Sequence, residues 1–163
     1  MEIKIRQIKE TDIKGFHKCL DSVAREGKYI AKEEAPDIER LKGFISNNIA
    51  NDFPQFVAID SNEVVGWCDA IPYQTKSLRH RAELGMGVMK SFRGRGIGEK
   101  LLLATINHAG KIGIKRINLE VRADNENAIG LYKKLGFKEY GRKKLGIFLE
   151  DKFHDLIVME YLM

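Results

Sequence analysis

The chain has 163 residues, of which 44% are hydrophobic and 31% charged, and its formal net charge is +5. This length and composition predict one globular domain over residues 1–163, and they exclude a disordered or membrane-spanning chain. The N-terminus does not resemble a signal peptide, and the two cysteines and four histidines show no metal-ligand spacing. We therefore expect a cytoplasmic protein with reduced thiols and no bound metal.

The first half of the chain shows a strand pattern, then two helix patterns, then two further strand patterns. Apolar residues alternate with polar ones in the strands and recur every three to four residues in the helices. A polar connection over residues 25–36 separates the two helices. The expected elements are a strand at 2–8, a helix capped by Thr11 or Asp12, a helix from about Pro36 through Ile49, and strands at 55–60 and 64–73.

The second half alternates strand and helix patterns. Its first strand, over residues 79–89, is interrupted by Gly85 and Gly87 and leads into a glycine-rich segment. The other expected elements are a helix at about 96–110, a strand at 114–122, a helix at 125–135, and strands at about 137–145 and 153–162. The order β-α-α-β-β-β-α-β-α-β-β predicts an α/β fold with a mixed sheet and helices on both faces.

A phosphate site is predicted where the strand at 79–89 leads into the next helix. Gly94, Gly96 and Gly98 alternate with other residues directly before that helix. Glycine lets backbone N–H groups approach a ligand, and a helix N-terminus adds unpaired donors and a partial positive charge. The spacing matches neither a Walker A loop nor a dinucleotide-binding fingerprint, so the phosphate belongs to another kind of ligand.

Two motifs resemble those of the GNAT acetyltransferase superfamily. Residues 93–98, with the pattern R-x-x-G-x-G, are similar to its coenzyme A loop, and residues 125–137 are similar to its N-x-x-A-x-x-x-Y and G-F segment. The resemblance implies the GNAT fold, in which two central strands splay apart around an acyl thioester. It also implies an enzyme that transfers acetyl from acetyl-CoA to a primary amine by direct attack in a ternary complex.

The resemblance also implies roles for individual residues. Tyr132 would protonate the departing thiolate, and Asn125 would bind the pantetheine or acetyl region; the alternatives are a core tyrosine and a helix cap. The base stays open between Glu120 and Glu83, each of which also fits an ordinary polar strand residue. The residues implied to hold coenzyme A are Val88, Met89, Lys90, Arg93, Gly94, Arg95, Gly96, Ile97, Gly98 and Glu99, with solvated surface charge as the alternative for the two arginines.

Charge distribution bears on the ligands. Residues 76–144 hold 17 Lys or Arg and 6 Asp or Glu, a balance of +11, which suits coenzyme A better than nucleic acid. Six acidic residues flank the expected acceptor side and predict an acidic rim that attracts a small cationic amine such as an amino acid or polyamine: Glu26, Glu33, Glu34, Glu150, Asp151 and Asp155. A protein N-terminus or lysine is the alternative acceptor, and a non-catalytic acyl-CoA sensor is the alternative of another class. The resemblance leaves a homodimer open.

Overall fold

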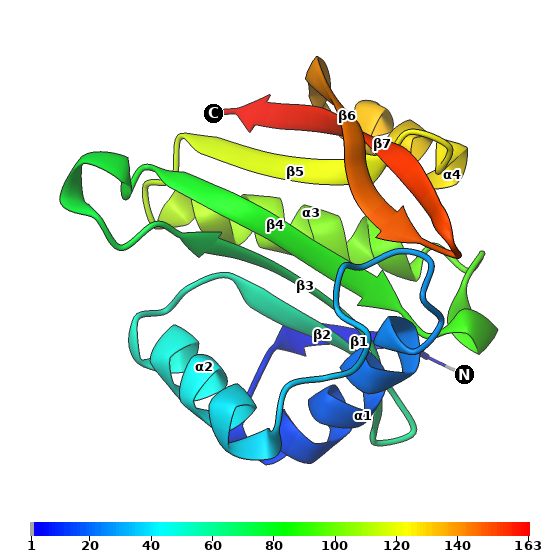
Figure 1. Cartoon of the computed structure of the whole chain (residues 1–163). Helices are drawn as coiled ribbons and strands as arrows, with labels where there is room; N and C mark the ends of the chain where they lie inside the picture. Colours follow the sequence, from blue (N-terminus) through cyan, green and yellow to red (C-terminus); the bar gives the residue numbers. More distant parts are fainter. Residues whose placement is uncertain (1) are drawn as a thin grey trace.

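The computed structural model describes residues 2–163 and is built around a seven-stranded sheet with the order β1-β2-β3-β4-β5-β7-β6 (Figure 1). β4 and β5 run parallel, and every other neighbouring pair is antiparallel. The strands are β1 (Lys4–Gln7), β2 (Gln55–Asp60), β3 (Glu63–Pro72), β4 (Arg81–Val88), β5 (Arg116–Arg122), β6 (Lys138–Leu149) and β7 (Lys152–Leu162). The predicted mixed sheet is confirmed.

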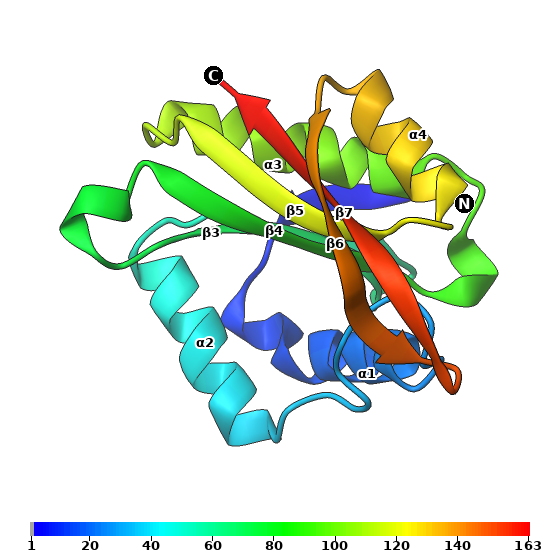
Figure 2. The ribbon, with the colours of Figure 1, turned by 45° about the horizontal axis from the view of Figure 1, so that its top comes forward.

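Helices cover both faces of the sheet, as Figures 1 and 2 show. They are α1 (Ile13–Ala24), α2 (Ile38–Ala50), α3 (Ile97–Lys111) and α4 (Glu126–Lys134). One buried cluster joins α1 and α2 to β2 and β3, with Phe16 meeting Trp67 edge to face at 5.7 Å between ring centroids. A larger cluster joins α3 and α4 to the other face. Among the described residues, no helix combines the length and apolar character needed to cross a membrane.

The sheet opens between β4 and β5. These strands pair only at their beginnings, where residues 81–83 face residues 116–118. Beyond this point β4 pairs with β3 alone and β5 with β7 alone. The edge of β4 from Leu84 to Val88 therefore borders a gap in the hydrogen-bonded sheet, which confirms the predicted splay.

Most observed boundaries lie within two residues of the predicted ones, and three differences have a clear physical cause. Asp12 occupies the predicted N-cap position of α1, but its side chain makes no capping hydrogen bond, because its carboxylate accepts from Arg6 and from the Lys9 N–H instead. α2 begins at Ile38 and not at Pro36, and Asp37 caps it by accepting a hydrogen bond from the Arg40 N–H at 3.0 Å. β6 continues four residues past the predicted end because a register shift between Lys143 and Ile147 lets pairing with β7 resume.

Candidate active site

The loop before α3 offers a row of unpaired backbone donors. Gly94 and Gly96 have φ values of 76° and 75°, a conformation that side chains rarely adopt. No side chain caps α3, and the N–H groups of residues 94–99 donate to no acceptor within residues 2–163. Such a row at a helix N-terminus fits a pyrophosphate, because every anionic oxygen can meet an N–H group without a side chain intervening.

The two arginines of this loop have partners inside the protein. Arg93 donates two hydrogen bonds to the carboxylate of Glu26 at 2.6 and 2.9 Å and a third to the Val88 carbonyl at 2.8 Å. Arg95 is exposed and donates to the Ser91 carbonyl at 3.0 Å. The side chain of Arg93 is therefore neither free surface charge nor turned toward a phosphate. It ties the loop to the connection between α1 and α2.

The open edge of β4 supplies further backbone donors. Met89 donates its N–H to the Val65 carbonyl of β3 at 2.9 Å, and its own carbonyl accepts from the Phe92 N–H at 2.9 Å. Because backbone groups alternate sides along a strand, Leu84, Met86 and Val88 direct theirs toward the gap. The Val88 N–H can thus meet a thioester carbonyl. The backbone of Met89, which was expected to pair with pantetheine, is already occupied; that of Lys90 keeps a free N–H.

Tyr132 lies on α4, and Asn125 is the residue directly before this helix. Tyr132 is 8% exposed and packs against Phe137, yet its hydroxyl has no hydrogen-bond partner among residues 2–163. Burial raises the pKa of the Tyr132 phenol, so the group keeps its proton throughout the physiological range. Asn125 accepts from the Ala128 N–H at 3.3 Å and so caps α4, while its amide N–H groups stay unpaired. Both expected uses of Asn125 are compatible with this arrangement.

Glu83 and Glu120 project from the sheet face opposite α4. Glu83 accepts hydrogen bonds from the Tyr73 hydroxyl at 2.6 Å and from the Asn118 amide at 3.3 Å, which places it where β4 and β5 separate. Glu120 forms an ion pair with Lys143. The hydrogen bond that Tyr73 donates to Glu83 stabilises the protonated phenol and so raises the pKa of Tyr73. Both carboxylates thus lie across the sheet from Tyr132, and both already have partners.

A third carboxylate on this face was not among the predicted site residues. Asp69 lies on β3 directly opposite Gly85 of β4, and only 9% of it is exposed. Burial raises the pKa of Asp69 to about 7, because charge is poorly solvated there. A signal was present in the sequence, since Asp69 is an acidic residue inside the apolar run of residues 64–72.

The raised pKa of Asp69 predicts a pH-dependent stability. The folded state, with a pKa of about 7 in place of 3.8, holds a proton that the unfolded chain releases between these values. The free energy of unfolding therefore falls as pH rises through this window, by at most about 4 kcal/mol. We expect Asp69→Asn to remove this slope and to be more stable than the wild type above about pH 8. Urea unfolding at several pH values measures it; a wild-type stability that does not fall across the window would contradict it.

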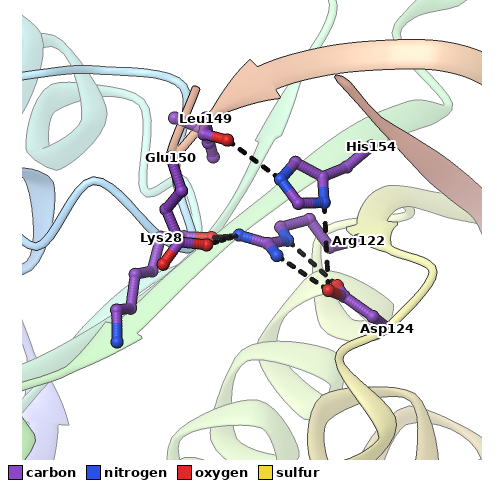
Figure 3. A network of polar contacts seen from close by, with 6 residues as sticks. All are labelled: Lys28, Arg122, Asp124, Leu149, Glu150 and His154. Carbon is purple, nitrogen blue, oxygen red and sulfur yellow. Dashed lines mark hydrogen bonds and ion pairs between the residues drawn. The ribbon is translucent and has the colours of Figure 1, made fainter. Parts of the chain in front are cut away.

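Arg122, at the end of β5, joins three segments around the acceptor side (Figure 3). Its guanidinium donates to the Lys28 carbonyl at 2.9 Å, to the Glu150 carboxylate at 3.0 Å, and to both oxygens of Asp124. The Nδ1 atom of His154 lies 3.9 Å from the Oδ2 atom of Asp124. This group, which we call the Arg122 clasp, holds the α1–α2 connection against the β6–β7 turn. A polar cavity of ≈ 380 Å³ lies beside it, lined by Tyr29, Asn125 and neighbouring residues.

The predicted acidic rim is largely neutralised. Arg93 pairs with Glu26, and Arg122 pairs with Glu150. Two further rim carboxylates also have arginine partners: Glu34 with Arg25 at 3.3 Å and Asp155 with Arg142 at 2.7 Å. Four of the six rim carboxylates thus have arginine partners, whereas Glu33 and Asp151 form no ion pair within residues 2–163. The sequence did not indicate these partners, because composition counts charges without their long-range contacts, and attraction of a cationic amine stays a prediction. Within residues 2–163, no group of three or more His, Cys, Asp or Glu side chains is placed to hold a metal ion.

Comparison with known proteins identifies the family. Residues 18–137, well over half of the chain, match the acetyltransferase (GNAT) family. L-methionine sulfoximine/L-methionine sulfone acetyltransferase of Pseudomonas aeruginosa is 26% identical over 96% of this chain and 95% of its own length. Ribosomal-protein-alanine N-acetyltransferase from Brucella melitensis superposes with a TM-score of 0.89 at 27% identity, covering 98% of this chain and 99% of that one. A phosphinothricin acetyltransferase from Sinorhizobium meliloti in complex with AcCoA superposes with a TM-score of 0.91 at 21% identity. The match covers 100% of this chain and 89% of that one. The chain belongs to the GNAT family and is an acetyl-CoA-dependent N-acetyltransferase.

Proposed function

We propose that this enzyme acetylates the primary amine of a small molecule, of the amino-acid type, by direct attack within a ternary complex. The Arg122 clasp is the observation that carries the proposal. It fastens the α1–α2 connection to the β6–β7 turn, so the acceptor side of the sheet is bridged rather than open. A compact amine can pass beneath such a bridge more readily than a folded protein with an extended terminus.

A cation on the acceptor face favours an amine that also carries a carboxylate. Arg81 begins β4 on the same face as Glu83 and stacks on the Tyr73 ring at 5.2 Å. Its buried Nε has no hydrogen-bond partner, and its guanidinium forms no ion pair, among residues 2–163. Arg81 and Val88 stand at opposite ends of β4, so Arg81 acts on the acceptor by long-range attraction and not by direct contact during transfer. Its positive charge draws an amine that carries a carboxylate toward this face, whereas a polyamine would find most rim carboxylates already paired.

The names of the relatives point to two acceptor classes. The Pseudomonas aeruginosa relative, which aligns over nearly its whole length, acts on amino-acid analogues. The Brucella melitensis structure is named for a ribosomal-protein alanine. The clasp favours the first class for this chain, and a protein N-terminus remains the alternative.

The proposed mechanism uses both faces of the sheet. The N–H groups of residues 94–99 bind the pyrophosphate of acetyl-CoA, which supplies the acetyl thioester. The Val88 N–H stabilises the negative charge that develops on the carbonyl oxygen. A carboxylate on the α1–α2 face takes the proton of the attacking amine, for which Glu83 and Glu120 are the candidates from the sequence. Tyr132, on the opposite face, gives its proton to the departing thiolate.

Thiol release from acetyl-CoA, measured with matched acceptors, tests this proposal. We expect turnover with amino acids, lower turnover with the corresponding amino-acid amides, and little with polyamines or N-terminal peptides. The amides isolate the contribution of the carboxylate, because they keep the amine and side chain. Activity confined to peptides would contradict the small-molecule acceptor, and equal activity with acids and amides would contradict the role of Arg81.

A further inference from the structure

A buried polar row crosses the sheet and ends at the gap between β4 and β5. Gln55 of β2, Asp69 of β3 and Gly85 of β4 are Cα partners across three adjacent antiparallel strands. Directly opposite residues share a face, so the side chains of Gln55 and Asp69 both point toward α2. Asn48 of α2 donates to the Gln55 side-chain oxygen at 2.9 Å, which fixes this side of the row.

Two glycines on β4 uncover this row. A Cβ at Gly87 would lie 2.4 Å from the Trp67 ring, and a Cβ at Gly85 would lie 3.2 Å from the Asp69 carboxylate. Both glycines lie on the part of β4 that borders the gap. Because Gly85 and Gly87 put no side chain on this face of β4, the Asp69 carboxylate of β3 extends across β4 to the rim of the gap. Any larger residue at position 85 would stand between Asp69 and a molecule in the gap.

Asp69 has no partner of its own. Its carboxylate forms no hydrogen bond or ion pair within residues 2–163, whereas Glu83 accepts two hydrogen bonds and Glu120 pairs with Lys143. The buried side-chain N–H of Gln55 is also unpaired. Uncharged Gln55 and Gly85 are the Cα partners of Asp69 on the two neighbouring strands, and uncharged Asn48 of α2 bonds to Gln55. Glu83 lies two residues from Gly85 on the same face of β4, and burial alone raises the pKa of Asp69. An unpaired carboxylate in these surroundings is costly to keep charged and ready to accept a proton.

We propose that Asp69 is the proton acceptor of the acetyl transfer. This assignment rests on the proposed amine acetylation. As the amine nitrogen bonds to the acetyl carbon, the C–S bond breaks and its electron pair stays on sulfur. One N–H proton passes to the Asp69 carboxylate, directly or through one water, and Tyr132 supplies a proton to the thiolate. Asp69 then returns its proton to solvent, and Tyr132 regains one. The amide and the free thiol of coenzyme A are the products.

The test compares Asp69→Asn with wild type in full pH profiles of kcat/KM, using the best acceptor from the thiol-release assay. Wild type should gain activity as pH rises through about 7, where a base of that pKa loses its proton. Asp69→Asn should lose at least about 100-fold in kcat and lack this limb, with the KM for acetyl-CoA unchanged within about twofold. Asp60→Asn is the matched control, because Asp60 is buried on β2 away from the gap and should keep wild-type kcat.

Each result bears on the assignment. Asp69→Asn that keeps kcat and the pH limb overturns it, and loss of the limb in Glu83→Gln alone moves the base to Glu83. If Asp69→Asn does not fold, a wild-type profile that is flat around pH 7 still overturns the assignment. A wild type that transfers acetyl to no amine overturns the proposed function, and the Asp69 assignment with it. Partial activity in Asp69→Glu, with the rising limb of its kcat/KM pH profile shifted to another pH, would support the assignment.

Discussion

Gly96→Asp should weaken acetyl-CoA binding by at least about 100-fold, measured by isothermal titration calorimetry. The substitution has two effects at the loop before α3. Gly96 adopts a φ of 75°, which costs a residue with a Cβ about 1–2 kcal/mol. A carboxylate there also places negative charge among the N–H groups of residues 94–99, where the pyrophosphate is expected. Together these effects remove both the geometry and the electrostatic attraction of the site.

The control for this substitution is Gly43→Asp. Gly43 lies exposed on α2, where an added Cβ would meet nothing within 4 Å, and it has no place in the phosphate loop. The variant carries the same added charge and should leave acetyl-CoA affinity within about twofold, since exposed charges far from a site are screened. If Gly96→Asp binds acetyl-CoA as tightly as Gly43→Asp, the pyrophosphate does not rest on this loop.

Tyr132→Phe should lower kcat by about 100-fold while leaving the KM for acetyl-CoA nearly unchanged. The hydroxyl forms no hydrogen bond with residues 2–163, so its removal leaves no partner group unpaired, and the remaining ring keeps its packing on Phe137. The loss therefore falls on the step in which the thiolate needs a proton. Steady-state kinetics and the thermal unfolding midpoint, measured together, separate this loss from a loss of fold.

Tyr161→Phe provides the comparison. Tyr161 packs against the same Phe137, with ring centroids 5.4 Å apart, but it lies on β7. It should keep kcat within about twofold. Equal kcat in Tyr132→Phe and Tyr161→Phe would make Tyr132 a core residue only, and the thiolate would then take its proton from another source.

Local sequence patterns were sufficient for much of the fold and of the cofactor loop. Hydrophobic periodicity located the helices, and the alternating glycines located the row of unpaired N–H groups, because both depend on neighbours in sequence. Pairings across the chain were not accessible in this way. Arg93 and Glu26 are 67 residues apart, and nothing local indicates their contact.

Asp69 illustrates the same limit within the site. As a sequence position it is one acidic residue in an apolar strand. Its significance comes from the β3–β4 register, which places it opposite Gly85, and from the separation of β4 from β5 beyond Glu83. A shift of one residue in that register would turn its side chain toward α3. Glu83 and Glu120 were predictable because they lie near the family motifs, whereas their partners Tyr73 and Lys143 are distant in sequence and contact them only in the fold.

With the substrates bound as proposed, the contact between Arg93 and Glu26 would couple their binding. One end of the contact belongs to the glycine-rich loop, where acetyl-CoA is proposed to bind, and the other to the connection that the Arg122 clasp holds over the proposed acceptor side. A ligand that orders either segment lowers the entropic cost of ordering the other. Linkage is reciprocal, so an acceptor that raises the affinity for acetyl-CoA must have its own affinity raised by the same factor. Substrate synergism of this kind would limit hydrolysis of the thioester before an amine is bound.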